Sequence, residues 1–171
     1  PKIIVEMRYA STNNFTGVQV YPAAVCVLRR GTAEKLAKAN AEFAKYGLRL
    51  KVWDAYRPLS VQKLFWSLVP DSRYVANPYG QGSRHNRGTA VDVTLVDEDG
   101  NELEMPSGFD DFSDRAQPNY PGITLTARIN AAYLNKVMES AGFTGIDSEW
   151  WHFDDSRWRE YPVENISLEQ F

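Results

Sequence analysis

The alternation of apolar and polar side chains along the chain predicts several short strands. Val91, Val93 and Leu95 alternate with polar residues, which is the period of two that a half-buried strand imposes. The Asp99-Gly100 pair that follows predicts a hairpin turn. Together with a short aromatic-rich run late in the chain, these patterns predict strands over 3–9, 48–52, 91–95, 101–105 and 148–154.

Apolar residues spaced three and four apart predict helices over 32–46, 60–69 and 126–140. Thr32 and Ser60 stand where side chains cap helix N-termini, and Gly47 and Gly142 stand where helices end. Helices and strands follow one another without strict alternation. We therefore expect an α+β fold, in which a central antiparallel sheet is flanked by helices and the functional site lies at the sheet.

Two segments between these elements are irregular. Residues 70–88 are rich in Gly, Pro, Asn, Ser and Arg, and residues 106–123 contain Phe109 and Asp110. Loops as long as the first segment usually carry function when they occur inside a compact domain. We therefore expect functional residues within 70–88.

Length and composition limit the class of protein. With 171 residues, 43% of them apolar and 24% charged, the chain suffices for one compact soluble domain, and we treat residues 1–171 as a single domain. No apolar run approaches the length of a membrane span. The net charge of −3, with both signs interspersed, provides no broad basic surface, so we expect no nucleic-acid partner.

The cysteine content and the pattern at the start of the sequence also limit the class of protein. Cys26 is the only cysteine, which excludes an intramolecular disulfide, a thiolate zinc site and an iron–sulfur site. The chain does not open with a charged segment followed by an apolar run, so we expect no signal peptide within it. A cytoplasmic location is favoured, and a periplasmic or extracellular one stays open if such a peptide was removed. No pattern indicates an oligomeric state.

Two short motifs combine metal-binding side chains with bends. His85 ends the long loop and Asp92 lies in the next strand, so a turn at Gly88 could bring the imidazole and the carboxylate together. His152 follows Glu149 in the aromatic-rich strand. These side chains provide two imidazoles, one ligand carboxylate and one spare carboxylate. An open catalytic zinc site uses this set, with water in the fourth position.

Each of these residues also has a simpler interpretation. A lone histidine is usually a surface residue or a satisfied core residue, and an aspartate at the start of a strand is usually a turn or cap residue. Glu149 could simply be solvated. The metal interpretation gains weight because His85 and His152 are the only histidines of the chain, and each stands beside a carboxylate. Residue types alone leave both interpretations open.

Longer motifs contain these residues in a fixed order. They read Ser83-x-His85-x-x-Gly88-x-Ala90-x-Asp92 and Glu149-x-x-His152, with Asn14-Phe15-Thr16-Gly17, Asp54-Ala55-Tyr56-Arg57-Pro58 and Phe109-Asp110 as further landmarks. From about residue 13 to 154, the chain resembles the D-alanyl-D-alanine dipeptidase family of zinc peptidases. The two metal motifs also occur in related carboxypeptidases and murein endopeptidases, and the Asn-Phe-Thr-Gly and Phe-Asp pieces favour the dipeptidases.

The resemblance implies a role for each residue of the two metal motifs. One zinc ion per chain would be bound by His85, Asp92 and His152, and Glu149 would act as general base on the zinc-activated water. The expected substrate is a small peptide, D-Ala-D-Ala or a similar peptidoglycan-derived dipeptide.

The resemblance also implies residues that contact the substrate. Arg57 would stabilise the tetrahedral intermediate, and the alternative for Arg57 is a structural ion pair with Asp54. Asp110 would bind the free ammonium group of the substrate, whereas Ser83 and Tyr21 would meet its carboxylate end. The alternative for Asp110 is a solvated acidic loop.

Two other functions are compatible with the same motifs. One is a zinc D,D- or L,D-carboxypeptidase or endopeptidase that acts on longer murein peptides. The other is a non-catalytic zinc-bearing binding module on the same scaffold. Glu149 and Arg57 argue against the second, because a structural zinc ion needs neither a general base nor an oxyanion-stabilising cation.

Overall fold

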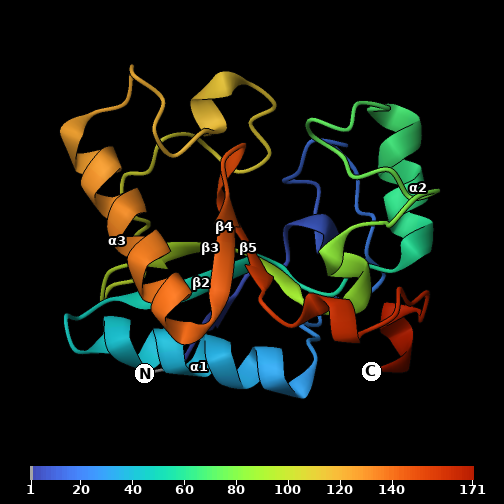
Figure 1. The fold of residues 1–171 in the computed structure, drawn as a ribbon, viewed down its shortest axis with the longest axis horizontal. Coiled ribbons are helices and arrows are strands. Elements are labelled where there is room, and N and C mark those ends of the chain that lie inside the picture. Colours follow the sequence, from blue (N-terminus) through green and yellow to red (C-terminus); the bar gives the residue numbers. More distant parts are fainter. Residues whose placement is uncertain (1) are drawn as a thin grey trace.

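A single twisted sheet organises the protein in the computed structural model, which describes residues 2–171 (Figure 1). Within these residues the sheet has five strands in the order β1-β2-β3-β5-β4. The strands are β1 (Ile4–Val5), β2 (Arg49–Asp54), β3 (Ala90–Val96), β4 (Phe143–Ile146) and β5 (Glu149–Asp155). All neighbouring pairs are antiparallel except β1–β2, which is parallel. The expected α+β fold is confirmed, with a sheet that is mixed at one edge.

The three longer helices have different positions relative to the sheet. They are α1 (Arg30–Ala44), α2 (Leu59–Leu68) and α3 (Leu125–Ala141). Helices α1 and α3 pack against each other and against the sheet, and α2 lies apart from them beside the N-terminal loops (Figure 1). Short 3₁₀ helices occupy Arg8–Ala10, Arg84–Arg87, Asp114–Ala116, Trp158–Glu160 and Leu168–Gln170.

Two expected helix caps are wrong. Thr32 lies inside α1, and its hydroxyl donates to Asp155 Oδ2 at 2.7 Å. This tertiary hydrogen bond replaces the helix cap that the sequence pattern predicted for Thr32. Helix α2 begins at Leu59, directly after Pro58, whose side chain cannot cap it. The backbone N–H of Ser60 is satisfied instead by Asn165 Oδ1 at 2.8 Å.

Gly142 caps α3 as expected, whereas α1 ends at Ala44, three residues before Gly47. Gly47 and Gly142 have φ of 71° and 103°, the left-handed conformation that glycine adopts without a steric penalty. At the start of α3, the Thr124 hydroxyl accepts from the backbone N–H of Ala127 at 3.0 Å, a cap that the sequence patterns did not identify.

Two strand predictions need correction, and one strand was not predicted. The first strand is confined to Ile4–Val5 because the chain turns into a 3₁₀ helix at Arg8. The return strand expected over 101–105 is reduced to one bridge between Val96 and Glu102. Strand β4 was not expected. A Cβ at its Gly145 would lie 2.6 Å from Asn135 Oδ1 on α3, so a larger residue there would displace the Asn135 side chain.

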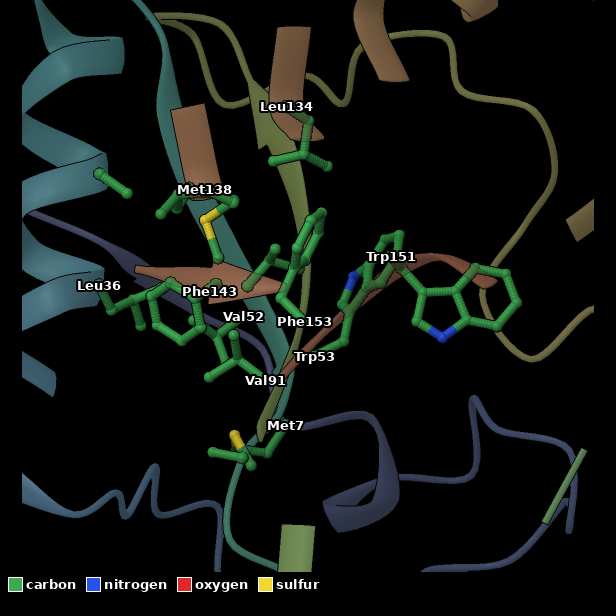
Figure 2. Packing of buried hydrophobic residues seen from close by; sticks show 14 of the residues in the cluster. Met7, Leu36, Val52, Trp53, Val91, Leu134, Met138, Phe143, Trp151 and Phe153 are labelled. Carbon is green, nitrogen blue, oxygen red and sulfur yellow. The ribbon is translucent and has the colours of Figure 1, made fainter. Parts of the chain in front are cut away.

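The hydrophobic core fills the space between the sheet and the helices. Leu36 of α1, Met138 of α3 and Phe143 of β4 meet Val52 and Val91 of the central strands, and all five are buried (Figure 2). Strand β3 is buried over its whole length, so the face that does not meet the helices is covered as well. That second face carries the polar side chains of the candidate site.

Three tryptophan rings pack together beside that site, and one of them, Trp151, lines its cavity. Trp53 and Trp150 pack edge to face with ring centroids 5.8 Å apart, and Trp150 packs in the same way on Trp151 at 5.6 Å. Figure 2 shows Trp53 and Trp151 beyond the aliphatic part of the core.

Among the described residues, no helix has the length and apolarity needed to cross a membrane.

Candidate metal centre and active site

The sheet register places three polar residues side by side across β2, β3 and β5. Asp54 pairs with Asp92, and Asp92 pairs with His152. Facing residues on adjacent strands project to the same side of a sheet, so their side chains gather at one point. The pairing therefore unites residues that are 60 positions apart in the chain.

His85 reaches the same point from the loop before β3. The Ser83 hydroxyl accepts from the backbone N–H of His85 at 3.2 Å and starts the 3₁₀ helix Arg84–Arg87. Gly88 ends that helix with φ of 69°, so the chain reverses into β3 as the sequence motif suggested. The imidazole of His85 is then almost fully buried.

Three acceptor atoms converge at the centre. His85 Nε2 lies 3.2 Å from His152 Nδ1, and Asp92 Oδ1 lies 3.3 Å from His85 Nε2 and 3.0 Å from His152 Nδ1. The structure thus brings together the three residues expected to bind metal, and each of them is buried.

The outer nitrogen of each imidazole fixes the tautomer. His85 Nδ1 lies 2.6 Å from the carbonyl oxygen of Ala55, which can only accept, so Nδ1 carries the hydrogen and Nε2 presents its lone pair inward. His152 Nε2 lies 2.8 Å from Asp154 Oδ1, so Nδ1 of His152 presents its lone pair inward in the same way.

This arrangement fits a metal ion. Two inward lone pairs and a carboxylate repel one another unless a cation lies between them. A tetrahedral zinc ion with bonds of about 2.0–2.1 Å separates its ligand atoms by about 3.3 Å, close to the separations seen here. The Asp154–His152 contact is the carboxylate–imidazole pairing that raises ligand basicity in zinc sites. The residues present therefore fit zinc.

Electrostatics keep the ligand carboxylate ionised. Burial alone would raise the pKa of Asp92, but the positive charge that His85 and His152 carry when protonated outweighs burial and holds this pKa well below the usual range, and a bound cation would act in the same direction. An ionised carboxylate is the form that binds a metal.

Glu149 lies beside the centre without joining it. Its Oε2 is 4.0 Å from His152 Nδ1, and its side chain is only slightly exposed. Burial raises the pKa of the Glu149 carboxyl to about 7, although the neighbouring His152 opposes the shift. A carboxylate with this environment is suited to accept and return a proton near neutral pH.

Arg57 lines the same cavity and is held rigidly. Its Nε and Nη2 donate to Asp54 Oδ2 at 3.0 and 2.6 Å, and its Nη1 donates to Gln62 Oε1 at 2.8 Å. Nη2 also lies 4.0 Å from Asp92 Oδ2. The ion pair with Asp54 therefore exists, and it fixes a guanidinium that still faces the metal centre.

Asp110 lies at another part of the cavity wall. It adopts φ of 57°, which is unusual for a residue other than glycine, and both of its carboxylate oxygens accept from the Tyr9 hydroxyl, at 3.0 and 2.9 Å. Burial raises the pKa of the Asp110 carboxyl to about 8, and the charge on Asp92 adds to this. The solvated acidic loop is thus not what the structure shows at this position.

The two other expected substrate contacts differ in position. Ser83 lines the cavity and lies two positions before His85 in the sequence. Tyr21 is fully buried, and its hydroxyl donates to Asp54 Oδ1 at 2.7 Å. Tyr21 is not among the residues that line the cavity. Its hydroxyl bond to Asp54 supports the Asp54–Arg57 ion pair, and its side chain does not face the substrate space.

The cavity has a volume of about 240 Å³. Pockets for drug-sized ligands are usually larger, at about 300–1,000 Å³. The metal centre, Glu149, Arg57 and Asp110 all open into this one space. A ligand that contacts all of them must be small.

The comparisons with known proteins agree with this site. A family model described as D-ala-D-ala dipeptidase matches residues 1–165. A D-alanyl-D-alanine dipeptidase of Escherichia coli is 40% identical over 163 residues, which cover 95% of this chain and 84% of the relative. One of Enterococcus faecalis is 32% identical over 168 residues, covering 86% and 83%. The chain belongs to the D-Ala-D-Ala dipeptidase family.

Membership in the D-Ala-D-Ala dipeptidase family makes the protein a metallopeptidase and implies a metal cofactor. A carboxypeptidase or endopeptidase of longer murein peptides and a non-catalytic binding module are accordingly not favoured. The buried cluster of His85, Asp92 and His152 is where this cofactor can bind.

Other residues of this dipeptidase site escaped the sequence patterns. Asp154 lies two positions after His152 on the same strand, and the period of two would have placed it on the same face. Tyr9 lies 101 positions from Asp110, and Gln62 lies on α2, so no local pattern connects either to the site.

Proposed function

We propose that the protein is a zinc-dependent dipeptidase that hydrolyses D-Ala-D-Ala or a closely similar small dipeptide. The observation that carries this proposal is the convergence of two inward imidazole lone pairs and one carboxylate oxygen within 3.3 Å of one another, in a cavity that also contains Glu149. Family membership supports peptide hydrolysis as the reaction, and the two imidazoles with the carboxylate support zinc as the metal.

The proposed ligands are His85, Asp92 and His152. A zinc ion bound by them supplies Lewis acidity and lowers the pKa of a water molecule from about 15.7 towards about 7. The Ala55 carbonyl and the Asp154 carboxylate hold the two imidazoles in the tautomers that this binding needs.

Glu149 is the proposed general base. Its carboxylate lies close to the metal centre but outside the ligand set, so it is free to take the proton of the attacking water. The same carboxyl group then returns the proton to the leaving amine, which otherwise departs as a poor leaving group.

Arg57 is the proposed stabiliser of the negative charge that develops on the scissile carbonyl oxygen. Its guanidinium cannot swing freely, because Asp54 and Gln62 bind three of its nitrogens. A cation that is already positioned needs no reorganisation when the charge appears. The Asp54 ion pair, with Tyr21 behind it, thus supports the catalytic role.

Asp110 is the proposed site for the free ammonium group of the substrate. Burial disfavours its ionised form when it is alone, and an ammonium partner would restore that form. A substrate with a blocked N-terminus would leave this carboxylate buried without a partner, which is costly.

The experiment that tests the function compares two substrates. The zinc-loaded protein should cleave free D-Ala-D-Ala and should cleave N-acetyl-D-Ala-D-Ala about 10⁴-fold less efficiently, since a site built around one charge rejects the analogue that lacks it. Comparable kcat/KM values for the two substrates would contradict the dipeptidase proposal. Such a result would favour a carboxypeptidase.

A further inference from the structure

Three arginines among the described residues line the cavity, and they differ in what binds them. Arg57 is paired with Asp54 at 2.6 Å, and Arg73 is paired with Asp71 at 2.6 Å on the exposed rim. The side chain of Arg84 has no hydrogen-bond partner at its Nε among residues 2–171, although this atom is buried. Arg84 is therefore the lining guanidinium whose Nε donor is free.

The position of Arg84 is nevertheless well defined. Its guanidinium carbon lies 4.4 Å from the centre of the Trp158 ring, a cation–π contact that restrains the head group. Its Nε lies 3.7 Å from Asp154 Oδ2, too far for a hydrogen bond but close enough for attraction. The short helix that presents His85 begins with Arg84.

Arg84 and Asp110 have different neighbours in the cavity wall. Arg84 interacts with Asp154, the residue on the outer side of His152, whereas Asp110 interacts with Tyr9. A free dipeptide carries opposite charges at its two ends. If Asp110 binds the ammonium group, the carboxylate end needs a cation elsewhere in the same cavity.

We propose that Arg84 is a specificity-determining residue that binds the C-terminal carboxylate of the dipeptide. This inference rests on the proposed function and identifies the chemistry of its second subsite. Ser83, which also lines the cavity, is the neighbouring donor to the same end of the substrate.

The chemistry of the guanidinium suits this role. It presents parallel N–H donors that match the two oxygens of a carboxylate, which makes the contact directional as well as charged. Substrates whose C-terminus is an amide lose both the charge and the fork geometry. A peptide extended at its C-terminus carries its carboxylate beyond reach of Arg84. Recognition at Arg84 and Asp110 together would restrict the enzyme to dipeptides.

The test compares D-Ala-D-Ala with D-Ala-D-Ala amide in the zinc-loaded wild type, Arg84→Gln and Arg84→Lys. Arg84→Gln should reduce kcat/KM for the free dipeptide by about 10–100-fold, the scale of a hydrogen bond to a charged group, mainly through KM. Its kcat/KM for the amide should change by less than about 3-fold, so the preference for the carboxylate disappears. Arg84→Lys, which keeps the charge without the fork, should retain part of that preference.

Arg159→Gln is the matched control. The guanidinium carbon of Arg159 also lies 4.4 Å from the centre of the Trp158 ring, but Arg159 is exposed and is not among the residues that line the cavity. Its replacement should leave kcat/KM for both substrates unchanged.

Three outcomes would overturn the inference. Equal losses on dipeptide and amide would mean that Arg84 acts through Asp154 and His152, and loss of bound zinc in Arg84→Gln would mean the same. Unchanged kcat/KM for the dipeptide in Arg84→Gln would show that Arg84 does not bind the substrate. If the wild type cleaves neither substrate, the proposed function itself fails, whereas wild-type cleavage with the wrong variant pattern refutes the role of Arg84 alone.

Discussion

Nε2 of His152 lies 2.8 Å from Oδ1 of Asp154, two positions further along β5. This contact orients the ring, so that Nδ1 turns its lone pair towards Asp92 and His85. Asp154→Ala should therefore weaken metal affinity by about 10–100-fold while leaving the fold intact. Metal titration monitored by calorimetry measures the change. Asp147→Ala, in the exposed turn before β5, is the control, and an equal loss in both variants would refute the orienting role.

The ligand carboxylate and the catalytic carboxylate should separate cleanly by mutation. Glu149→Ala should keep its metal and lose about 10²–10⁴-fold in kcat, because general-base catalysis is removed while the three ligands remain. Asp92→Ala should lose the metal itself. Metal content and turnover are measured on the same samples. Retention of more than about a tenth of wild-type activity by Glu149→Ala would show that Glu149 is not the base.

Arg57 should affect both catalysis and stability. Arg57→Ala should reduce kcat by about 10²–10³-fold, the scale of a lost oxyanion donor. It should also lower the free energy of unfolding by about 3–5 kcal/mol, since Asp54 is fully buried and loses its charged partner. Steady-state kinetics and chemical denaturation measure the two effects.

A second variant separates these effects. Asp54→Asn removes the buried charge and retains the cation, so it should lower kcat less than Arg57→Ala does. If Asp54→Asn were the more damaging of the two for kcat, the ion pair and not the cation would be the important feature.

Asp110 should make the metal-free protein less stable as the pH rises. Burial raises its pKa from 3.8 to about 8, with Tyr9, Asp92, Arg57 and Glu149 as the charged or titratable groups around it. Between these values the folded state binds more protons than the unfolded state, so stability falls with increasing pH. Asp110→Asn removes this dependence and should be more stable than the wild type near pH 8, by on the order of a few kcal/mol.

Thermal unfolding of the metal-free wild type and Asp110→Asn between pH 5 and pH 8 measures this difference. The gap in Tm should widen towards pH 8. Asp111→Asn, the adjacent acid in the same loop, controls for the change of net charge. A constant gap across the pH range would show that Asp110 is not held in a raised-pKa environment.

The sequence patterns predicted those features that depend only on residues close together in the chain. The end of α3 at Gly142 and the central strand around Asp92 follow from spacing and backbone preference alone. The three proposed metal ligands could be found because the chain has only two histidines, each in a short motif with a carboxylate.

The remaining features depend on contacts between distant residues. Thr32 leaves its expected cap because Asp155, 123 positions away, provides a better acceptor. The parallel pairing of β1 with β2 has no signature in either strand. Tyr21 could be placed at the substrate by resemblance, but only the packed structure shows that Asp54 takes its hydroxyl.

The central claim is that a zinc ion held by His85, Asp92 and His152 is required for the hydrolysis of D-Ala-D-Ala. Release of D-Ala by chelator-treated protein, measured as zinc is added back, tests it most directly. The metal-free protein should be inactive, and activity should rise linearly to a plateau at one zinc ion per chain, with no recovery in His85→Ala at the same zinc concentration. Full activity of the metal-free wild type, or equal recovery by His85→Ala, would contradict the claim.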